Sequence, residues 1–385
     1  MKRTSPALTT VASDSSLHFL GSRRSPLSAE RTTYPHFNFI RLAAASSVIF
    51  SHAFLIGDGS EAREPFVRLL GEGHILGIFG VFVFFIVSGF LVSQSLLTAP
   101  STINYLWRRI LRIYPALLVC LVLSAFIVGP LYHDDGPLHF LTSIHDIKQA
   151  VKYVLGNLFW PGRTHEIEAV TFYGEPTGWL GSLINGSLWT ISYEVCCYVA
   201  LALLKIARMF NVWTVGGISL AMCLVNALGF YPSRLADFLF VAPAFFAGAA
   251  CYLISLQTQR PAILVAVVML ATVVLLIAAY EEMLLQIFPL AGAPLVLLLA
   301  TTHAIRLPDL HRLGDISYGV YLYGWPVEQV VRSFVGPTPL VVFALSLPLA
   351  CALGYVSWWV IEKPMLRYKR LIRSFHTLAR EGSET

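Results

Sequence analysis

The sequence predicts an all-α membrane protein, a polytopic bundle of about ten transmembrane helices with both termini in the cytoplasm. Three observations support this prediction. Hydrophobic residues make up 56% of the 385-residue chain and charged residues only 13%, which leaves too little polar surface for an ordinary water-soluble protein. Ten apolar runs have roughly the 20-residue length that crosses a bilayer as a helix. Lys and Arg are distributed unequally between the two sets of loops that these runs define.

The chain begins with residues 1–35, which are rich in Ser, Thr and Pro and lack the apolar core of a secretory signal. We expect a flexible cytoplasmic tail there, a membrane domain over 36–366, and a basic cytoplasmic tail over 367–385. Within the membrane domain, the predicted spans are 38–57, 75–97, 113–131, 186–206, 211–230, 237–256, 262–280, 285–305, 316–335 and 338–361.

The loop charges fix the orientation of these spans. With the N-terminus inside, 20 of the 27 Lys and Arg residues lie on the cytoplasmic side or at its boundary. The long outer segment 132–185 is rich in Gly and aromatic residues and exceeds a simple helix connection. It is a candidate lid or acceptor platform, and the alternative is an amphipathic stretch that only packs on the bundle. The outer loops keep only Arg63, Arg68, Lys148, Lys152, Arg163, Arg234 and Arg332.

The six cysteines all lie in apolar segments. They show neither metal-ligand spacing nor a disulfide framework, so we expect small buried hydrophobic side chains and no metal site.

Arg41 and His52 are ionisable residues of the first apolar run, eleven positions apart. Eleven residues make about three helical turns, so both side chains leave one helix face, about 16 Å apart along the axis. A charge inside a membrane helix costs about 3 kcal/mol on the mildest scale, so we expect both to face one polar cavity. Arg suits a phosphate or carbonyl oxygen, and His suits proton transfer. The alternatives are that Arg41 extends to the interface and that His52 only packs.

Glu194 lies about 12 Å inside the fourth span, at a depth similar to that of His52. A carboxylate that orients an imidazole is a familiar arrangement for a general base, so we predict a Glu194–His52 contact. The alternative is a protonated Glu194 that bonds a neighbouring helix. Ser88 lies nearly 20 Å from the outer end of the second span, too deep for a nucleophile activated by His52.

Basic residues gather before the third span. Arg108 and Arg112 are four residues apart and share a helix face at the cytoplasmic mouth, where they could bind phosphates. Basic residues at inner helix ends are equally what membrane topology alone requires. Near the C-terminus, Asp315 can cap the ninth span. Glu362 lies at the unfavourable end of the last helix dipole, and we expect an arginine of the 108–112 cluster to relieve it.

Five motifs, taken together and in order, resemble those of the acyltransferase 3 family of integral membrane acyltransferases. The resemblance covers most of residues 36–370. Arg41 and His52 resemble the family's R-x10-H signature. The other motifs are Gly80-Val-Phe-Val-Phe-Phe-Ile-Val-Ser88-Gly89-Phe-Leu, Arg108-Arg109-Ile-Leu-Arg112-Ile-Tyr114-Pro115, Ser187-Leu-Trp189-Thr-Ile-Ser-Tyr-Glu194, and the late Ile316-Ser-Tyr318-Gly-Val-Tyr-Leu with Glu362-Lys-Pro364.

The resemblance implies transfer of an acyl group, commonly acetyl from cytoplasmic acyl-CoA, to a hydroxyl of an acceptor at the outer side. Family members acylate sugars, polysaccharides and other acceptors. We therefore expect a carbohydrate or glycolipid acceptor, contact with membrane lipids, no tightly bound cofactor, no nucleic acid partner, and a place in the bacterial inner membrane. The expected catalytic residues are His52, Arg41 and Glu194, and the expected substrate-binding residues are Arg108, Arg109, Arg112, Tyr114, Ser88, Gly89 and Trp189.

Two positions depart from the family pattern. Asn38 stands where members often have Asp, and Gly324 stands where they often have His, so a mechanism that needs a second histidine there is not expected. A different class of function, a transporter or flippase with a charged permeation path, would also suit ten helices. Its best sequence sign, a pair of discontinuous helices in matching halves, is not seen. A membrane scaffold would not explain so many buried polar residues.

Overall fold

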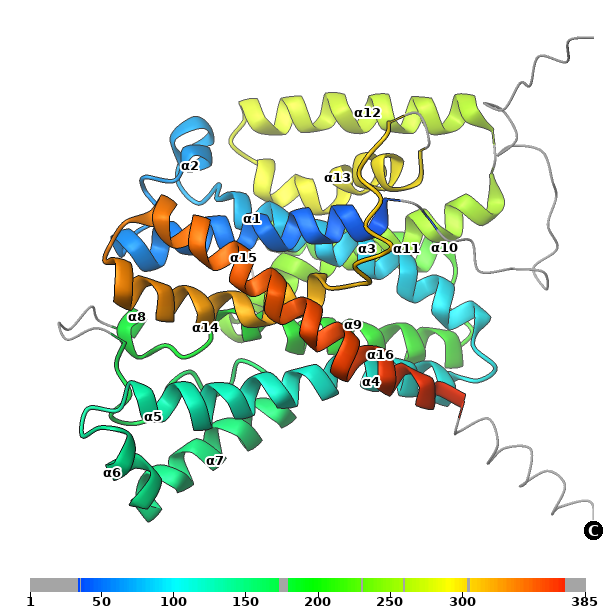
Figure 1. Ribbon diagram of the computed structural model, residues 1–385. Coiled ribbons are helices and arrows are strands. Elements are labelled where there is room, and N and C mark those ends of the chain that lie inside the picture. The colour runs from blue at the N-terminus through cyan, green and yellow to red at the C-terminus, as the bar shows by residue number, and fades with distance from the viewer. Residues whose placement is uncertain are drawn as a thin grey trace, which may run out of the picture.

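The computed structural model describes residues 34, 36–172, 179–229, 231–258, 260–302 and 305–370, and it confirms an all-α bundle (Figure 1). Most of the two predicted tails lies outside these residues. In the described ranges, each predicted span is a helix. These helices are α1 (Phe37–Asp58), α3 (Leu76–Thr98), α4 (Thr102–Leu123), α9 (Trp189–Ile206), α10 (Val212–Leu228), α11 (Ala236–Gln257), α12 (Pro261–Tyr280), α13 (Leu284–Thr301), α14 (Ser317–Val335) and α15 (Pro339–Ser357).

The third span begins earlier than predicted. Helix α4 starts at Thr102 rather than near residue 113, because the Ser101 hydroxyl accepts a bond from the Asn104 amide and caps the helix. The helix continues through a π-helical turn, 124–128, into the short α5 (Gly129–Leu131). The last span likewise continues from α15 through a π-helical turn, 358–362, into α16 (Lys363–Met365). The basic cluster at 108–112 is therefore part of a spanning helix.

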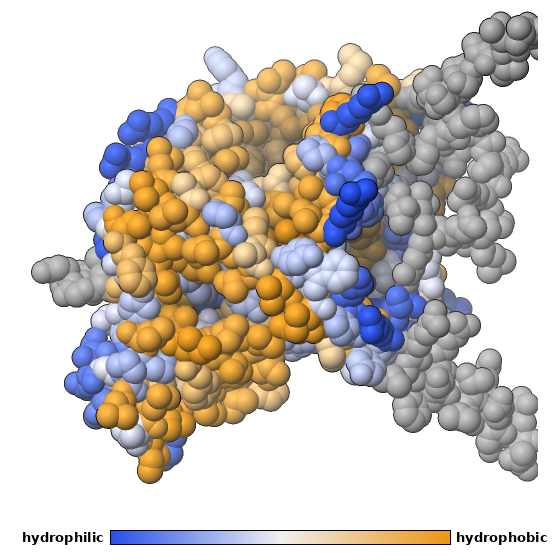
Figure 2. All heavy atoms as spheres, viewed as in Figure 1, coloured by the Kyte–Doolittle hydropathy of each residue, from blue (hydrophilic) through white to orange (hydrophobic). Residues whose placement is uncertain are grey.

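Eight helices of the described chain are long and apolar enough to cross a membrane. Helix α10 has only 17 residues, and α14 is not among the eight. Most of α14 is buried inside the bundle, so its polar side chains face protein rather than lipid. Apolar side chains cover the middle of the molecule in Figure 2, between hydrophilic residues at its left and right ends, as a membrane protein requires.

The two ends of the described chain lie at the same end of the bundle, on the right in Figure 1, where α1 begins and the helical turns after α16 finish. This arrangement agrees with an even number of crossings. Helix α12 lies at the edge of the bundle, and its window of membrane-spanning residues is only 11% buried, which is typical of a lipid-facing helix.

Helices α3 and α11 cross at the centre of the bundle through two glycines. A Cβ atom added to Gly89 would lie 1.9 Å from the Phe245 carbonyl oxygen, and one added to Gly248 would lie 2.0 Å from the Ile86 carbonyl oxygen. Only glycine permits this approach of two backbones, which is how membrane helices gain packing contacts without a hydrophobic driving force.

The outer segment 132–185 contains α6 (Pro137–Thr142), α7 (Ile144–Phe159) and α8 (Trp179–Ser182), with residues 173–178 outside the description. Helix α7 buries one face, including Tyr153, and exposes Leu155 on the other, as the interfacial alternative predicts. The stretch around α8 instead binds α14. The Gln329 amide donates to the carbonyls of Leu180 and Leu183, at 2.8 and 2.9 Å.

Candidate active site

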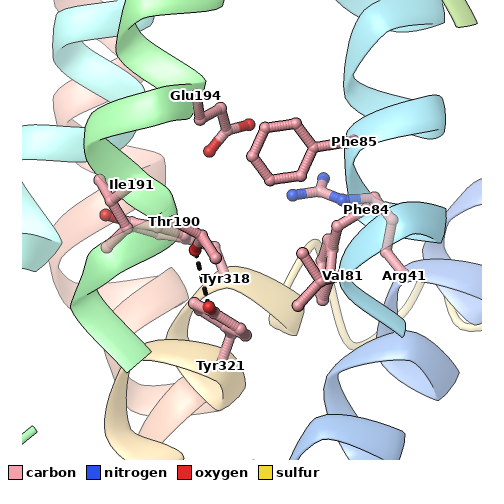
Figure 3. Close-up of a pocket in the computed structure, with 9 residues that line it drawn as sticks. All are labelled: Arg41, Val81, Phe84, Phe85, Thr190, Ile191, Glu194, Tyr318 and Tyr321. Carbon is pink, nitrogen blue, oxygen red and sulfur yellow. Dashed lines mark hydrogen bonds between the residues drawn. The ribbon is translucent and has the colours of Figure 1, made fainter. Parts of the chain in front are cut away.

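A cavity opens between α1, α3, α9 and α14 (Figure 3). About 440 Å³ of space not filled by atoms lies between these helices, the open mouth included. Figure 3 shows the Arg41 guanidinium and the Glu194 carboxylate on either side of the Phe85 ring. Most of the wall is apolar or aromatic, and the full lining is Arg41, Val81, Phe84, Phe85, Thr190, Ile191, Glu194, Tyr318 and Tyr321.

Arg41 belongs to a chain of four charged side chains. Asp315 accepts from both Arg41 and Arg112, the second at 2.6 Å, and Arg112 also pairs with Glu362. All four side chains are 20% exposed or less, and the two cations balance the two carboxylates. Burial would raise the pKa of the Asp315 carboxyl, but Arg112 and Arg41 outweigh burial and hold this pKa at about 2.

This network corrects two predictions and confirms one. Asp315 is not the cap of α14, since Ile316 occupies that position, but the acceptor for two arginines. Arg112 faces two carboxylates and the rings of Tyr318 and Trp358, so its charge is already compensated and it does not fit the predicted role of phosphate ligand. The expected relief of Glu362 by an arginine of the 108–112 cluster is confirmed.

The predicted Glu194–His52 contact is wrong. Glu194 accepts from the Ser88 hydroxyl at 2.7 Å and from the Tyr198 hydroxyl, one turn along its own helix. Arg109 lies over the Tyr198 ring, 5.8 Å from the centroid. Glu194 thus bonds Ser88 on the neighbouring helix α3, which is the contact that the alternative expected, while the protonation of Glu194 stays a prediction. The hydrogen-bond partner of Ser88 is the Glu194 carboxylate rather than the His52 imidazole.

His52 meets a different carboxylate. Its Nδ1 atom lies 3.6 Å from Oε2 of Glu328, on α14, and its ring packs edge-on against Trp325 at 4.7 Å between centroids. The Trp325 Nε1 donates to the Leu183 carbonyl at 3.1 Å, which ties the indole to the stretch that includes α8. Sequence reasoning passed over Glu328, although an acidic residue in a membrane span was the signal that singled out Glu194.

The face shared by Arg41 and His52 was predicted correctly, because both side chains reach toward α14 and the residues just before it. The prediction that both side chains face one cavity is wrong. Arg41 lines the cavity and His52 does not, and in the cavity wall the Thr190 and Tyr321 hydroxyls bond at 2.7 Å (Figure 3).

Several predicted binding residues lie elsewhere. Gly89 packs against the α11 backbone, so it serves helix packing and not a ligand. Trp189 packs edge-on against Tyr193 at the start of α9, and neither Trp189 nor the half-buried Tyr114 lines the cavity. Arg108 is half-buried on α4 beside Arg109.

Gly324 faces α1. A Cβ there would lie 2.9 Å from Cγ1 of Ile49, so this chain has no room for a histidine at that position unless Ile49 moves.

Within the described ranges, no group of three His, Cys, Asp or Glu side chains is arranged to hold a metal ion. The cysteines in those ranges are free, and Cys120, Cys197 and Cys223 are buried, in line with the role of small hydrophobic side chains.

Comparison with known proteins identifies a family and two relatives. The sequence pattern of a family described as an acyltransferase domain matches residues 34–360. The chain is 30% identical over 353 residues to a protein named O-acetyl transferase from Shigella phage Sf6, covering 86% of this chain and 95% of that protein. It is 27% identical over 371 residues to nodulation protein 10 of Rhizobium leguminosarum bv. viciae, covering 87% and 94% of the two chains. No solved structure matches.

Proposed function

This chain belongs to the acyltransferase 3 family of membrane acyltransferases, and on that premise we propose that it moves an acetyl group from cytoplasmic acetyl-CoA to a hydroxyl of a carbohydrate acceptor at the outer side of the membrane. The proposal of an acetyl group is supported by the relative that is named O-acetyl transferase. The cavity and the position of His52 support the assignment of residues to the two substrates.

The donor site is built around Arg41. Its guanidinium lines a mainly apolar cavity, which suits a thioester whose acyl group is apolar and whose carbonyl oxygen accepts a hydrogen bond. Asp315 holds Arg41 in place, and Arg112 and Glu362 in turn hold Asp315. Arg109 and Arg108, further toward the predicted cytoplasmic end of α4, are the cations that we assign to the phosphates of the donor.

The acceptor site is built around His52, about 16 Å further along α1 than Arg41. Its side chain is 15% exposed, so part of the imidazole remains accessible while Glu328 is fully enclosed. The acceptor hydroxyl gives its proton to His52 as its oxygen attacks the thioester carbonyl. The new bond joins that oxygen to the acyl carbon, the C–S bond breaks, and the departing CoA thiolate takes up the proton that His52 received, which returns the imidazole to its neutral form. The Arg41 guanidinium lies about 16 Å away along α1, so we assign it to holding the donor and not to the carbonyl oxygen of the reacting thioester.

The single observation that carries this proposal is that α1 presents Arg41 and His52 to one neighbouring region, at Asp315 and on α14. A cation for the donor and a proton acceptor for the hydroxyl thus lie along one helix–helix seam, at two depths in the membrane. Structural roles alone would not require both groups on the same face.

The test compares ester content in cells. O-acetyl groups on surface and secreted glycans would be measured in strains with the gene, without it, and complemented with His52→Ala or Arg41→Ala, at equal protein level by immunoblot. We expect the gene to add ester groups and both variants to lose them. Full O-acetylation with His52→Ala would refute the proposal.

A further inference from the structure

The described chain contains a buried carboxylate that its own fold leaves unsatisfied. Glu328 is 0% exposed, and neither of its oxygens has a hydrogen-bond partner among the described residues. The same holds for Nδ1 of His52, which lies 3.6 Å from Oε2 of Glu328. These two buried groups are therefore placed for each other, since leaving either one alone would cost several kcal/mol.

The neighbouring residue shows what a structural polar group looks like at this place. Gln329 is also 0% exposed, and its amide donates to two backbone carbonyls of the stretch that includes α8, so it holds that stretch onto α14. Glu328 makes no comparable hydrogen bond to the described residues. A carboxylate that serves only packing would be expected to accept from a backbone or side-chain donor, as nearly all buried polar groups do.

The surroundings of His52 also fix its ring. Trp325 packs edge-on against the imidazole, and the indole is itself held by its bond to the Leu183 carbonyl and by contact with Gly186, where an added Cβ would lie 2.7 Å from the ring. With the ring held on this side, Nδ1 faces Glu328 and the opposite nitrogen, Nε2, is the one left for chemistry.

We propose that Glu328 is the positioning residue for His52, an inference that rests on the proposed function. Its carboxylate accepts the Nδ1 proton, which fixes the tautomer with an unprotonated Nε2, and it stabilises the imidazolium that forms when His52 takes the proton of the acceptor hydroxyl. The 3.6 Å separation shortens to a hydrogen bond when the substrates are present, as catalytic contacts often do.

The test uses membranes from cells that make the acceptor, supplied with radiolabelled acetyl-CoA, and measures label incorporated into glycan at several donor concentrations. Glu328→Gln keeps the shape of the side chain and removes its charge. We expect the apparent kcat to fall about 100-fold or more, because proton transfer by a positioned base contributes on that scale. The KM for acetyl-CoA should stay within about twofold, because Glu328 does not line the donor cavity. Glu328→Asp, which keeps the carboxylate, should retain more activity than Glu328→Gln.

The matched control is Glu64→Gln. Glu64 is also 0% exposed, but it accepts from the Ser51 hydroxyl at 2.6 Å and from the Leu76 amide at 2.9 Å, bonds that an amide oxygen can replace. This variant should keep its activity. In a His52→Ala background, Glu328→Gln should cause no further loss, because a positioning residue acts only through the group that it positions.

The possible results distinguish a failure of the proposed function from a failure of the positioning role of Glu328. If His52→Ala remains active, the proposed function fails. If His52→Ala is inactive while Glu328→Gln matches the wild type, the function stands and the positioning role is overturned. A further loss in the double variant, or a Glu328→Asp variant less active than Glu328→Gln at equal protein level, would also overturn it.

Discussion

Replacing Asp315 with Asn removes the carboxylate that holds two buried arginines. The pKa of Asp315 lies at about 2 instead of the ordinary 3.8, and its side chain is only 20% exposed, so solvent screens the interaction little. At about 1.36 kcal/mol per pKa unit, this difference corresponds to about 2 kcal/mol of folding stability at pH 7. We therefore expect Asp315→Asn to lower the free energy of unfolding by about 2 kcal/mol, since Arg112 keeps Glu362 while Arg41 loses the carboxylate that it pairs with.

The pH dependence of this stability difference tests whether the charge of Asp315 is its cause. Because the folded-state pKa lies below the unfolded one, the contribution of Asp315 is complete at neutral pH and is lost as pH falls through about 2. The difference between wild type and Asp315→Asn should shrink to about 1 kcal/mol at pH 3. Denaturant unfolding in mixed micelles, followed by circular dichroism at pH 7 and pH 3, measures both values. An equal difference at the two pH values would show that the charge of Asp315 is not the source.

Two further substitutions test the helix packing and the Thr190–Tyr321 hydrogen bond in the cavity wall. Gly89→Ala should lower stability by about 1–3 kcal/mol, because its Cβ would lie 1.9 Å from the Phe245 carbonyl oxygen, and thermal unfolding in detergent measures the loss. Gly217→Ala is the control, since its Cβ meets nothing within 4 Å in α10 and should be neutral or stabilising. Thr190→Val should cost about 1–3 kcal/mol, because it leaves the buried Tyr321 hydroxyl unpaired. The double variant with Tyr321→Phe should recover most of that loss in the same assay, and a fully additive double loss would contradict this account.

Most of the long helices could be predicted from sequence because each has an apolar run of about the length that spans a bilayer, and a run of that length has few alternatives. The start of α4 was missed because its first turns are polar and basic, so hydropathy assigns them to a loop, whereas Ser101 caps a helix there. Arg41 and His52 could be assigned to one face because helical geometry fixes the angle between them.

The partners of these residues could not be predicted, because they depend on which helices are neighbours. Depth alone made Glu194 a suitable partner for His52, yet α14 and not α9 packs beside this part of α1. Glu328 had the same sequence signal as Glu194 but no motif that drew attention to it. Depth within the membrane limits which residues can meet, and the packing of the helices decides which of them do.

Tyr321 lies on the face of α14 that joins the two parts of the proposed site. On α14, Tyr318, Tyr321, Trp325 and Glu328 follow at spacings of three, four and three residues, so they form one helix face. The first two line the cavity of Arg41, and the last two contact His52. In the proposed mechanism, an acyl group held at Arg41 would therefore pass Tyr321, whose hydroxyl bonds that of Thr190, on its way to His52.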